Sequence, residues 1–200
     1  MNEVEGFDEC RPAPRPLDLE RSALISGLER TLRQGGLGNP DVNLIRTPEG
    51  FVVVKDFAPR PFWVRATLGR WLTRHEQGIY RALEGIDLLP RLLGQVDRYA
   101  FAMEYRPGRL LSRALRPELP GHFLTDLERG VDEMHKRGVV HLDLSHRSNI
   151  LLGEDGRPVL LDFASAIRFG SGGPLRRMLT SWLALIDRRA LKKWRAKFRT

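Results

Sequence analysis

Two charged residues interrupt apolar patterns in this chain, and they constrain its fold more than any other feature. In residues 51–57, Lys55 lies in the same alternating row as two phenylalanines and a valine, which is typical of a strand with a buried face. In residues 64–85, Glu76 lies within an apolar stripe with helical spacing. Because an unpaired buried charge is costly, a strand and a helix that pack together can bury both residues as a pair. The alternative is a lysine that extends to solvent and a glutamate on the surface.

A second group of polar residues lies between apolar runs. Asp143 and Asn149 belong to a short loop before the run Ile-Leu-Leu, and Asp162 directly follows the apolar residues 158–161. A carboxylate at the end of a hydrophobic strand faces a cleft, and oxygen ligands of this kind suit Mg²⁺. Phosphoryl transfer needs a metal, a lysine on the phosphates and a carboxylate that orients the nucleophile. These residues therefore indicate phosphoryl transfer.

At these residues the sequence resembles the protein-kinase superfamily. VVVK at 52–55 resembles the kinase strand with the phosphate-binding lysine, HLDL at 141–144 with Asn149 resembles the catalytic loop, and LDFA at 161–164 resembles the metal-binding motif. The motifs occur in the family's order over residues 51–164. The resemblance implies a two-lobed α+β fold with a minimal C-terminal lobe.

The resemblance also divides the chain into parts. The proline-rich residues 1–16 are expected to be a disordered arm and residues 17–200 a kinase-like domain, with MEYRPG at 103–108 resembling a hinge. The parts of the domain, in chain order, would be an N-terminal lobe at about 17–104, a hinge at about 104–108 and a C-terminal lobe at about 109–200.

The resemblance implies a role for each charged residue of the motifs. Lys55, paired with Glu76, would hold the α- and β-phosphates of ATP. Asp143 would be the catalytic carboxylate that orients the acceptor hydroxyl and accepts its proton. Asn149 and Asp162 would ligate Mg²⁺.

Nucleotide binding would involve two further segments. Backbone groups near Glu104 and Tyr105 would bind adenine, as in a kinase hinge. A glycine-containing loop that includes Gly35, Gly36 and Gly38 would cover the phosphates, although its fit to the kinase pattern is partial and a plain turn is the alternative.

The chain departs from the kinase pattern at several positions. Leu142 replaces the usual arginine, Ala164 replaces the usual glycine, and Asn149 follows Asp143 by six residues, one more than usual. His141 is expected to be a structural residue of the loop. These departures resemble atypical kinases of the RIO and bacterial lipopolysaccharide core types, and they also leave open a pseudokinase.

Local patterns predict the secondary structure of the whole chain. The expected elements are a helix at 18–34, a β-hairpin at 42–57, a helix at 64–85, two strands within 90–106, a helix at 123–137, short strands between 139 and 163, and helices at 174–199.

The net charge of +8 lies in residues 174–200, where nine basic residues accompany Asp187 alone. A first helix at 175–186 is expected to bury Leu175, Leu179, Trp182 and Ile186 in the core. Asp187 would cap a second helix at 188–199, with an apolar face opposite the basic one. Such a helix suits an anionic membrane surface, with an acidic partner as the alternative and nucleic acid as the least favoured partner.

The residues and the resemblance together predict an ATP- and Mg²⁺-dependent kinase that transfers the γ-phosphate to a hydroxyl, with a sugar of a membrane glycolipid such as lipopolysaccharide core as one candidate acceptor. The alternatives are a RIO-like serine/threonine protein kinase and a nucleotide-binding pseudokinase. No secretory signal or spanning segment is evident, and the single cysteine, Cys10, excludes an intrachain disulfide. A cytoplasmic protein, peripheral on the inner face of the membrane, is therefore expected.

Overall fold

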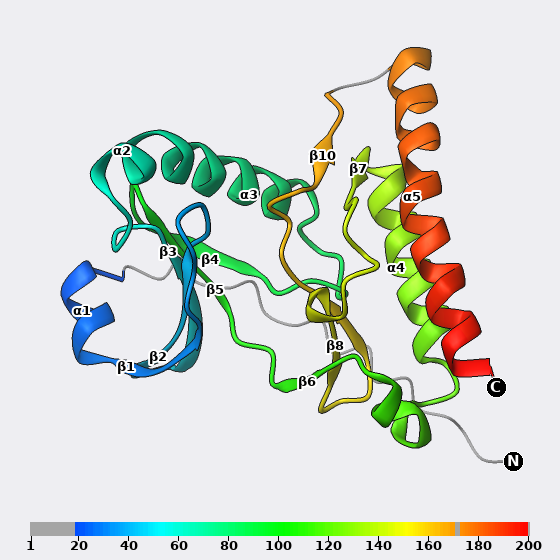
Figure 1. The fold of residues 1–200 in the computed structure, drawn as a ribbon, viewed down its shortest axis with the longest axis horizontal. Helices are drawn as coiled ribbons and strands as arrows, with labels where there is room; N and C mark the ends of the chain where they lie inside the picture. The colour runs from blue at the N-terminus through cyan, green and yellow to red at the C-terminus, as the bar shows by residue number, and fades with distance from the viewer. Residues whose placement is uncertain (1–18, 171–172, 200) are drawn as a thin grey trace, which may run out of the picture.

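The structure is a computed structural model, and it describes residues 19–170 and 173–199 of the chain. It has an α+β fold, in which a five-stranded antiparallel sheet is followed by helices and two small sheets (Figure 1). The predicted arm at 1–16 lies outside the described residues.

The large sheet has the strand order β1-β2-β3-β5-β4. Its strands are β1 (Leu28–Arg33), β2 (Asp41–Thr47), β3 (Gly50–Asp56), β4 (Leu92–Asp97) and β5 (Ala100–Glu104). The helical segments of this half are α1 (Arg21–Ser26), α2 (Phe62–Val64), the π-helical turn η1 (Arg65–Gly69) and α3 (Arg70–Ala82). The predicted hairpin, the long helix and the pair of strands are thereby confirmed.

The central strand β3 is buried on both faces, and its alternation decides which side chain meets which helix. Val53 belongs to the apolar cluster that also contains Ile79 of α3. Val52 and Val54 belong to a second cluster on the other side, together with Leu24 of α1. Lys55 shares the row of Val53 and therefore faces α3.

The rest of the chain forms a helical half with short strands. The strands are β6 (Gly108–Leu110), β7 (Val139–Val140), β8 (Ile150–Gly153), β9 (Pro158–Leu160) and β10 (Ile167–Arg168). The helices are the 3₁₀ turns η2 (Arg113–Glu118) and η3 (Arg147–Asn149), α4 (Phe123–Lys136) and α5 (Pro174–Arg199). Helices α4 and α5 lie side by side (Figure 1).

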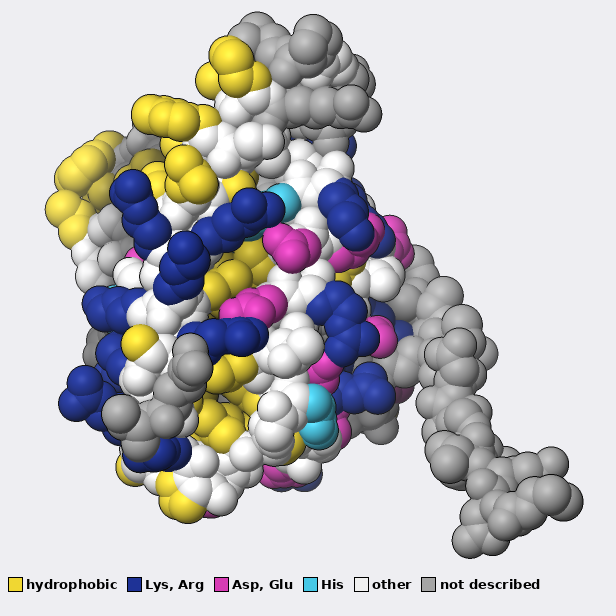
Figure 2. All heavy atoms as spheres, turned by 90° about the vertical axis from the view of Figure 1, so that its right-hand side faces the viewer, with side chains coloured by type: hydrophobic (Ala, Val, Ile, Leu, Met, Phe, Trp, Pro, Cys, Tyr) yellow, Lys and Arg dark blue, Asp and Glu magenta, His cyan; other side chains and the backbone are white. Residues whose placement is uncertain are grey.

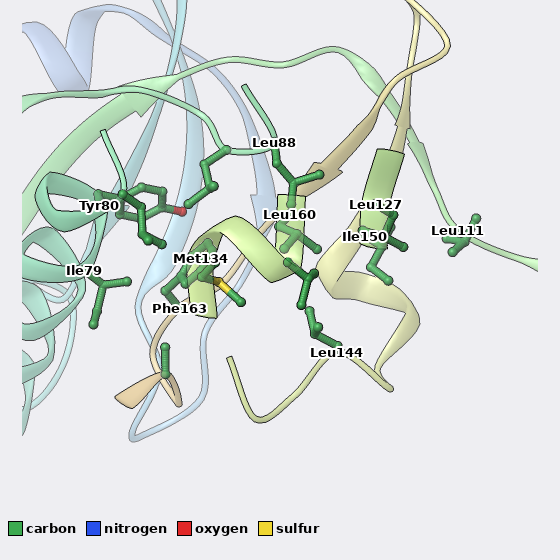
Figure 3. Close-up of a cluster of buried hydrophobic side chains, with 14 of the residues drawn as sticks. Ile79, Tyr80, Leu88, Leu111, Leu127, Met134, Leu144, Ile150, Leu160 and Phe163 are labelled. Carbon is green, nitrogen blue, oxygen red and sulfur yellow. The ribbon is translucent and has the colours of Figure 1, made fainter. Parts of the chain in front are cut away.

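One apolar core joins the two halves. Figure 3 shows Ile79 and Tyr80 of α3 in the same cluster as Met134 of α4 and Phe163. The Tyr80 and Phe163 rings meet edge to face with centroids 5.3 Å apart. The segment that contains Asp162 is thus packed against the helix that contains Glu76.

The predicted helix at 18–34 is wrong over its second half. Helix α1 ends at Ser26, and Leu28–Arg33 form the edge strand β1, paired with β2. At Gly27 the backbones approach closely: its carbonyl accepts a 2.7 Å hydrogen bond from the Arg46 amide, and a Cβ there would lie 2.5 Å from the Arg46 carbonyl oxygen. The helical spacing of the leucines in this segment is therefore overridden by the pairing of β1 with β2, which joins residues that are distant in the sequence.

The predicted division of residues 174–199 into two helices is also wrong. Helix α5 is continuous from Pro174 to Arg199, and Asp187 lies buried in its middle. Trp182 and Ile186, predicted for the core, are 69% and 42% exposed. The inward face is instead formed by Ala184, Asp187, Ala190, Leu191 and Trp194.

Candidate active site

The two interrupting charges form a buried pair. Lys55 on β3 and Glu76 on α3 are 7% and 3% exposed, and Lys55 Nζ lies 2.5 Å from Glu76 Oε1. Lys55 Nζ also lies 3.1 Å from Asp162 Oδ1, so one ammonium group joins β3, α3 and the segment after β9. The surface alternative for the lysine and the glutamate is excluded by this burial.

Lys55 and Asp162 keep each other ionised. Burial by itself would raise the pKa of Asp162, but the Lys55 ammonium, with a smaller effect of Arg33, holds that pKa below its usual value. Burial would likewise lower the pKa of Lys55, and the two carboxylates raise it instead. Glu76 Oε1 also accepts a 3.1 Å hydrogen bond from the Phe163 amide, which fixes the segment of Asp162 relative to α3.

Asp143 and Asn149 meet in the loop between β7 and β8. The Asn149 amide donates hydrogen bonds to Asp143 Oδ2 at 2.8 Å and to the Asp143 carbonyl at 3.0 Å. The 3₁₀ turn η3 accommodates the additional residue of this loop, and Asn149 is only 3% exposed. The longer loop therefore still directs Asn149 inward.

His141 connects this loop with the segment of Asp162. Its Nδ1 accepts a hydrogen bond from the Asp143 amide at 3.3 Å, and its Nε2 lies 3.1 Å from the Leu161 carbonyl, to which it donates. Burial lowers the pKa of His141, because the charged form would lose its hydration. A neutral, fully buried ring with both nitrogens engaged serves as scaffold.

Two residues of the site have left-handed backbone conformations. Leu142 has φ 69° and Asp162 has φ 63°, and they are the positive-φ residues other than glycine in the described chain. Such conformations are disfavoured for these residue types and concentrate at functional sites. Asp162 belongs to the charged cluster, and Leu142 directly precedes Asp143.

Helix α5 holds the loop between β7 and β8 in place through hydrogen bonds, a role that the sequence patterns did not reveal. Asp187 accepts 2.9 Å hydrogen bonds from the backbone amides of His141 and Leu142. A third 2.9 Å contact joins it to His135 Nε2 on α4. Seven residues further along α5, about two helical turns, the Trp194 indole donates a 2.8 Å hydrogen bond to the Leu144 carbonyl. In the sequence, Asp187 is the single acidic residue among nine basic ones in 174–200, which predicts a special role, but the local pattern favours a helix cap over a buried anchor.

The segment from β1 to β2 places an arginine at the site, and its glycines make contacts with residues beside the sheet. Arg33 Nη1 lies 3.3 Å from Asp162 Oδ2, a contact that sequence reasoning missed. The Gly35 amide donates a 2.8 Å hydrogen bond to Asp41, and Arg60 donates to the Gly35 carbonyl at 2.7 Å and the Gly36 carbonyl at 3.2 Å.

Gly35 itself makes a close turn, because a Cβ there would lie 2.3 Å from the Asn39 carbonyl oxygen. Gly38 lies in the same loop, where a Cβ would approach Leu68 at 3.7 Å. The described contacts therefore attach the loop of Gly35, Gly36 and Gly38 to the α2 side of the sheet, and none joins these glycines to Lys55 or Asp162.

The predicted hinge follows β5. Glu104 is held by Arg91 and Arg106, with nitrogen–oxygen distances of 3.6 and 3.7 Å, and the Glu104 amide donates to the Arg91 carbonyl at 2.9 Å. Tyr105 meets Phe51 edge to face, with ring centroids 6.2 Å apart. The Glu104 amide is thus already paired within the sheet.

The oxygen atoms at the site suit a magnesium ion that is shared with phosphates. Asp162 and Asn149 are linked through neighbouring backbone, since the Leu161 amide donates a 2.9 Å hydrogen bond to the Asn149 carbonyl. Over the described residues, no group of three or more His, Cys, Asp or Glu could hold a metal by itself. One carboxylate and one amide oxygen match Mg²⁺, which usually takes few protein ligands together with substrate phosphates. The residues present fit the predicted ion.

The basic tail is largely part of the C-terminal core. Ala190, Leu191 and Trp194 are buried, and Phe198 packs against the same cluster. The segment 188–199 thus lacks the free apolar face on which the membrane prediction rested.

The cations of α5 face outward beside acids of α4. Arg195 is paired with Glu128, and Arg188 lies 3.6 Å from Asp132. Figure 2 shows Lys and Arg side chains spread over this face, with Asp and Glu beside them. Part of the excess charge is therefore matched by the neighbouring helix, although exposed pairs stabilise a fold only weakly.

The five-stranded antiparallel sheet with its lysine–glutamate pair is consistent with a kinase-like N-terminal lobe. The chain is similar over 70 residues, at 36% identity, to serine/threonine-protein kinase 16 of Mus musculus, Homo sapiens and Rattus norvegicus. The match covers 30% of this chain and 23% of each relative. No family model matches the chain. The partial similarity suggests the protein-kinase-like superfamily and supports, in general terms, a kinase-like phosphotransferase.

Proposed function

We propose that this protein is an ATP- and Mg²⁺-dependent phosphotransferase that transfers the γ-phosphate to a hydroxyl group. The observation that carries the proposal is the buried cluster in which Lys55 Nζ contacts both Glu76 and Asp162. A lysine held by two carboxylates stays charged, and a charged lysine in a cleft can bind phosphate oxygens. The partial similarity to a kinase supports the same function.

The residues of the site would divide the work as follows. Lys55, oriented by Glu76, would hold the α- and β-phosphates, and Asp162 with Asn149 would hold Mg²⁺. When bound, ATP would supply the electrophilic phosphorus and Mg²⁺ would neutralise charge on the phosphates. Asp143 would orient the acceptor hydroxyl and accept its proton. The Asn149 amide, 2.8 Å from Asp143 Oδ2, keeps that carboxylate directed into the site.

For this function we propose that the chain has two lobes, one on either side of a hinge. We assign the N-terminal lobe to about 17–104, the hinge to about 104–108 and the C-terminal lobe to about 109–200. Adenine would bind to backbone near Tyr105, and the loop 35–38 would approach the phosphates when a nucleotide is bound. The break between β5 and β6 supports this division, because β5 belongs to the large sheet and β6 to a small one.

Two acceptors are candidates. The relatives are named as serine/threonine-protein kinases, which favours a protein hydroxyl as the acceptor. A glycolipid sugar, as in lipopolysaccharide core, was predicted from the tail, and the burial of Leu191 and Trp194 weakens that argument. The protein hydroxyl is therefore the first candidate.

Phosphate transfer from γ-labelled ATP tests the function directly. The purified protein, Mg²⁺ and a cell extract are incubated together, and the extract is then separated into protein, lipid and nucleic-acid fractions. We expect label in the protein fraction, and at least about 100-fold less label with Asp143→Asn, because a positioned general base contributes about that much. Asp162→Asn is expected to abolish the Mg²⁺ dependence of ATP binding, measured by calorimetry.

Asp87→Asn is the matched control, since the Asp87 side chain is 80% exposed in a loop away from the cluster. Transfer that survives in both Asp143→Asn and Asp162→Asn would refute the assigned roles. ATP binding without transfer into any fraction would identify a nucleotide-binding pseudokinase instead.

A further inference from the structure

The outer face of the helical segment α2–η1–α3 exposes four large apolar side chains. Phe62, Trp63, Leu68 and Trp71 are 71%, 63%, 42% and 59% exposed. The segment runs along one edge of the molecule (Figure 1). Trp63 in α2 and Trp71 in α3 lie on either side of the π-helical turn η1. We call these four residues the aromatic edge.

The π-helical turn contributes to this edge. Leu68 belongs to the stripe predicted for the core, but η1 inserts a wider turn at Arg65–Gly69 and changes the helical register. Gly69 permits a close approach to Phe57, where a Cβ would lie 3.0 Å from the phenylalanine side chain. Thr73, Glu76 and Ile79 still form a buried inner face of α3. The outer face is not needed for packing within the protein and can make another contact.

The charges around the aromatic edge have one sign. Residues 57–75 contain four arginines and no acidic residue. Arg65 is held within the protein, by a 3.0 Å hydrogen bond to the Ala58 carbonyl and by its position over the Tyr99 ring. Arg70 and Arg74 form no ion pair within the part of the chain that the structure describes. These two guanidinium groups can therefore meet an anionic partner.

We propose that the aromatic edge with Arg70 and Arg74 docks on an anionic lipid surface. Tryptophan and phenylalanine concentrate at the interface between headgroups and acyl chains, and flanking arginines bind anionic headgroups. The Trp63 and Trp71 indole N–H groups have no hydrogen-bond partner among the described residues, in contrast to Trp194, and headgroups or interfacial water can accept from both.

A membrane fits this surface better than a folded protein does. The exposed side chains lie along a helical segment, and an amphipathic helical segment can enter a membrane interface without a complementary pocket. The docking face lies opposite the buried face that holds Glu76, so a docked protein keeps its lysine–glutamate pair intact. Over the described residues no helix is long and apolar enough to cross a bilayer, and the proposed contact is interfacial.

Vesicle co-sedimentation of the full chain tests the proposal independently of phosphate transfer. We expect binding to vesicles of phosphatidylglycerol and phosphatidylethanolamine, weaker binding in higher salt, and little binding to phosphatidylcholine alone. The double variant Trp63→Ser/Trp71→Ser should bind at least about tenfold more weakly. Arg70→Gln/Arg74→Gln should lose about tenfold on anionic vesicles.

Matched variants on α5 provide the controls. Trp182→Ser removes a tryptophan that is 69% exposed, and Lys192→Gln/Lys193→Gln removes two exposed cations of the tail. Both should bind like the unchanged protein, and circular dichroism should show equal folding of all variants. Equal losses in the α5 variants would overturn the proposal, as would undiminished binding of the Trp63→Ser/Trp71→Ser protein. The proposal would also be overturned if the protein did not co-sediment with vesicles but formed a dimer that Trp71→Ser abolished.

Discussion

At the scale of single residues, the molecule depends on charges that are buried and paired. Lys55 and Glu76 interrupt apolar patterns because each is the partner of the other, and Asp162 completes the group. Burying an ion pair gains little free energy by itself, whereas removing one partner leaves an uncompensated charge. We therefore expect the value of this charged group to lie in fixing the position of the Lys55 ammonium relative to Asp162, and not in stabilising the fold.

Replacing Glu76 by alanine tests this point. We expect Glu76→Ala to lower the free energy of unfolding by about 3 kcal/mol, because Lys55 loses its shorter contact and the Phe163 amide loses its acceptor. Urea denaturation measures the effect. Glu84→Ala, an exposed change just after α3, should alter the stability by less than about 0.5 kcal/mol. Similar effects of the two variants would argue against a buried pair.

At the scale of elements, α5 connects the loop between β7 and β8 to the core. Its inward face is apolar except for Asp187, which is fully buried and accepts two backbone amides of the loop. Two consecutive amides that point at one carboxylate fix the direction of the chain at His141 and Leu142. The left-handed conformation of Leu142 is thereby held in place.

Asp187→Ala should therefore loosen the loop more than the helix. We expect a loss of about 2–4 kcal/mol in the free energy of unfolding, because two buried amides lose their acceptor. Hydrogen exchange should accelerate most at residues 141–144, while most of α5 stays protected. Asp132→Asn removes a surface acid of α4 that faces Arg188, and it should change neither quantity appreciably. Uniform acceleration over the whole chain would show that Asp187 serves only global stability.

At the scale of the whole molecule, stability depends on pH through a buried histidine. Burial lowers the pKa of His141 below its ordinary value of about 6.5. The unfolded chain binds a proton at this residue below about pH 6.5, and the folded protein does not until a lower pH. The folded state therefore has its full stability above about pH 6.5, and it loses stability as the pH falls from there toward the lower pKa of the folded state.

The slope of stability against pH is the measurement. As the pH falls below about 6.5, we expect His141 to contribute up to about 1.4 kcal/mol per pH unit to the decrease. His141→Asn should reduce this slope, whatever its effect on stability at pH 7.5. His122→Gln removes a histidine whose side chain is 61% exposed, and it should leave the slope unchanged. An unaltered slope in His141→Asn would show that other groups set the pH dependence.

The sequence alone determined the features that arise from neighbours in the chain. Alternation and helical spacing predicted the β2–β3 hairpin, the long helix through α3, the strands β4 and β5, and helix α4. They also singled out Lys55 and Glu76, because a charge within an apolar row needs a partner. Motif order then associated Asp162 with this pair.

Tertiary structure decided whatever depends on contacts between distant segments. The strand β1 forms because its backbone pairs with β2, although its leucines have helical spacing. The inward face of α5 is chosen by the loop it supports, so Asp187 is an anchor in mid-helix and Trp182 faces outward. Arg33 reaches Asp162 across 129 residues of sequence, and no local pattern records such a contact.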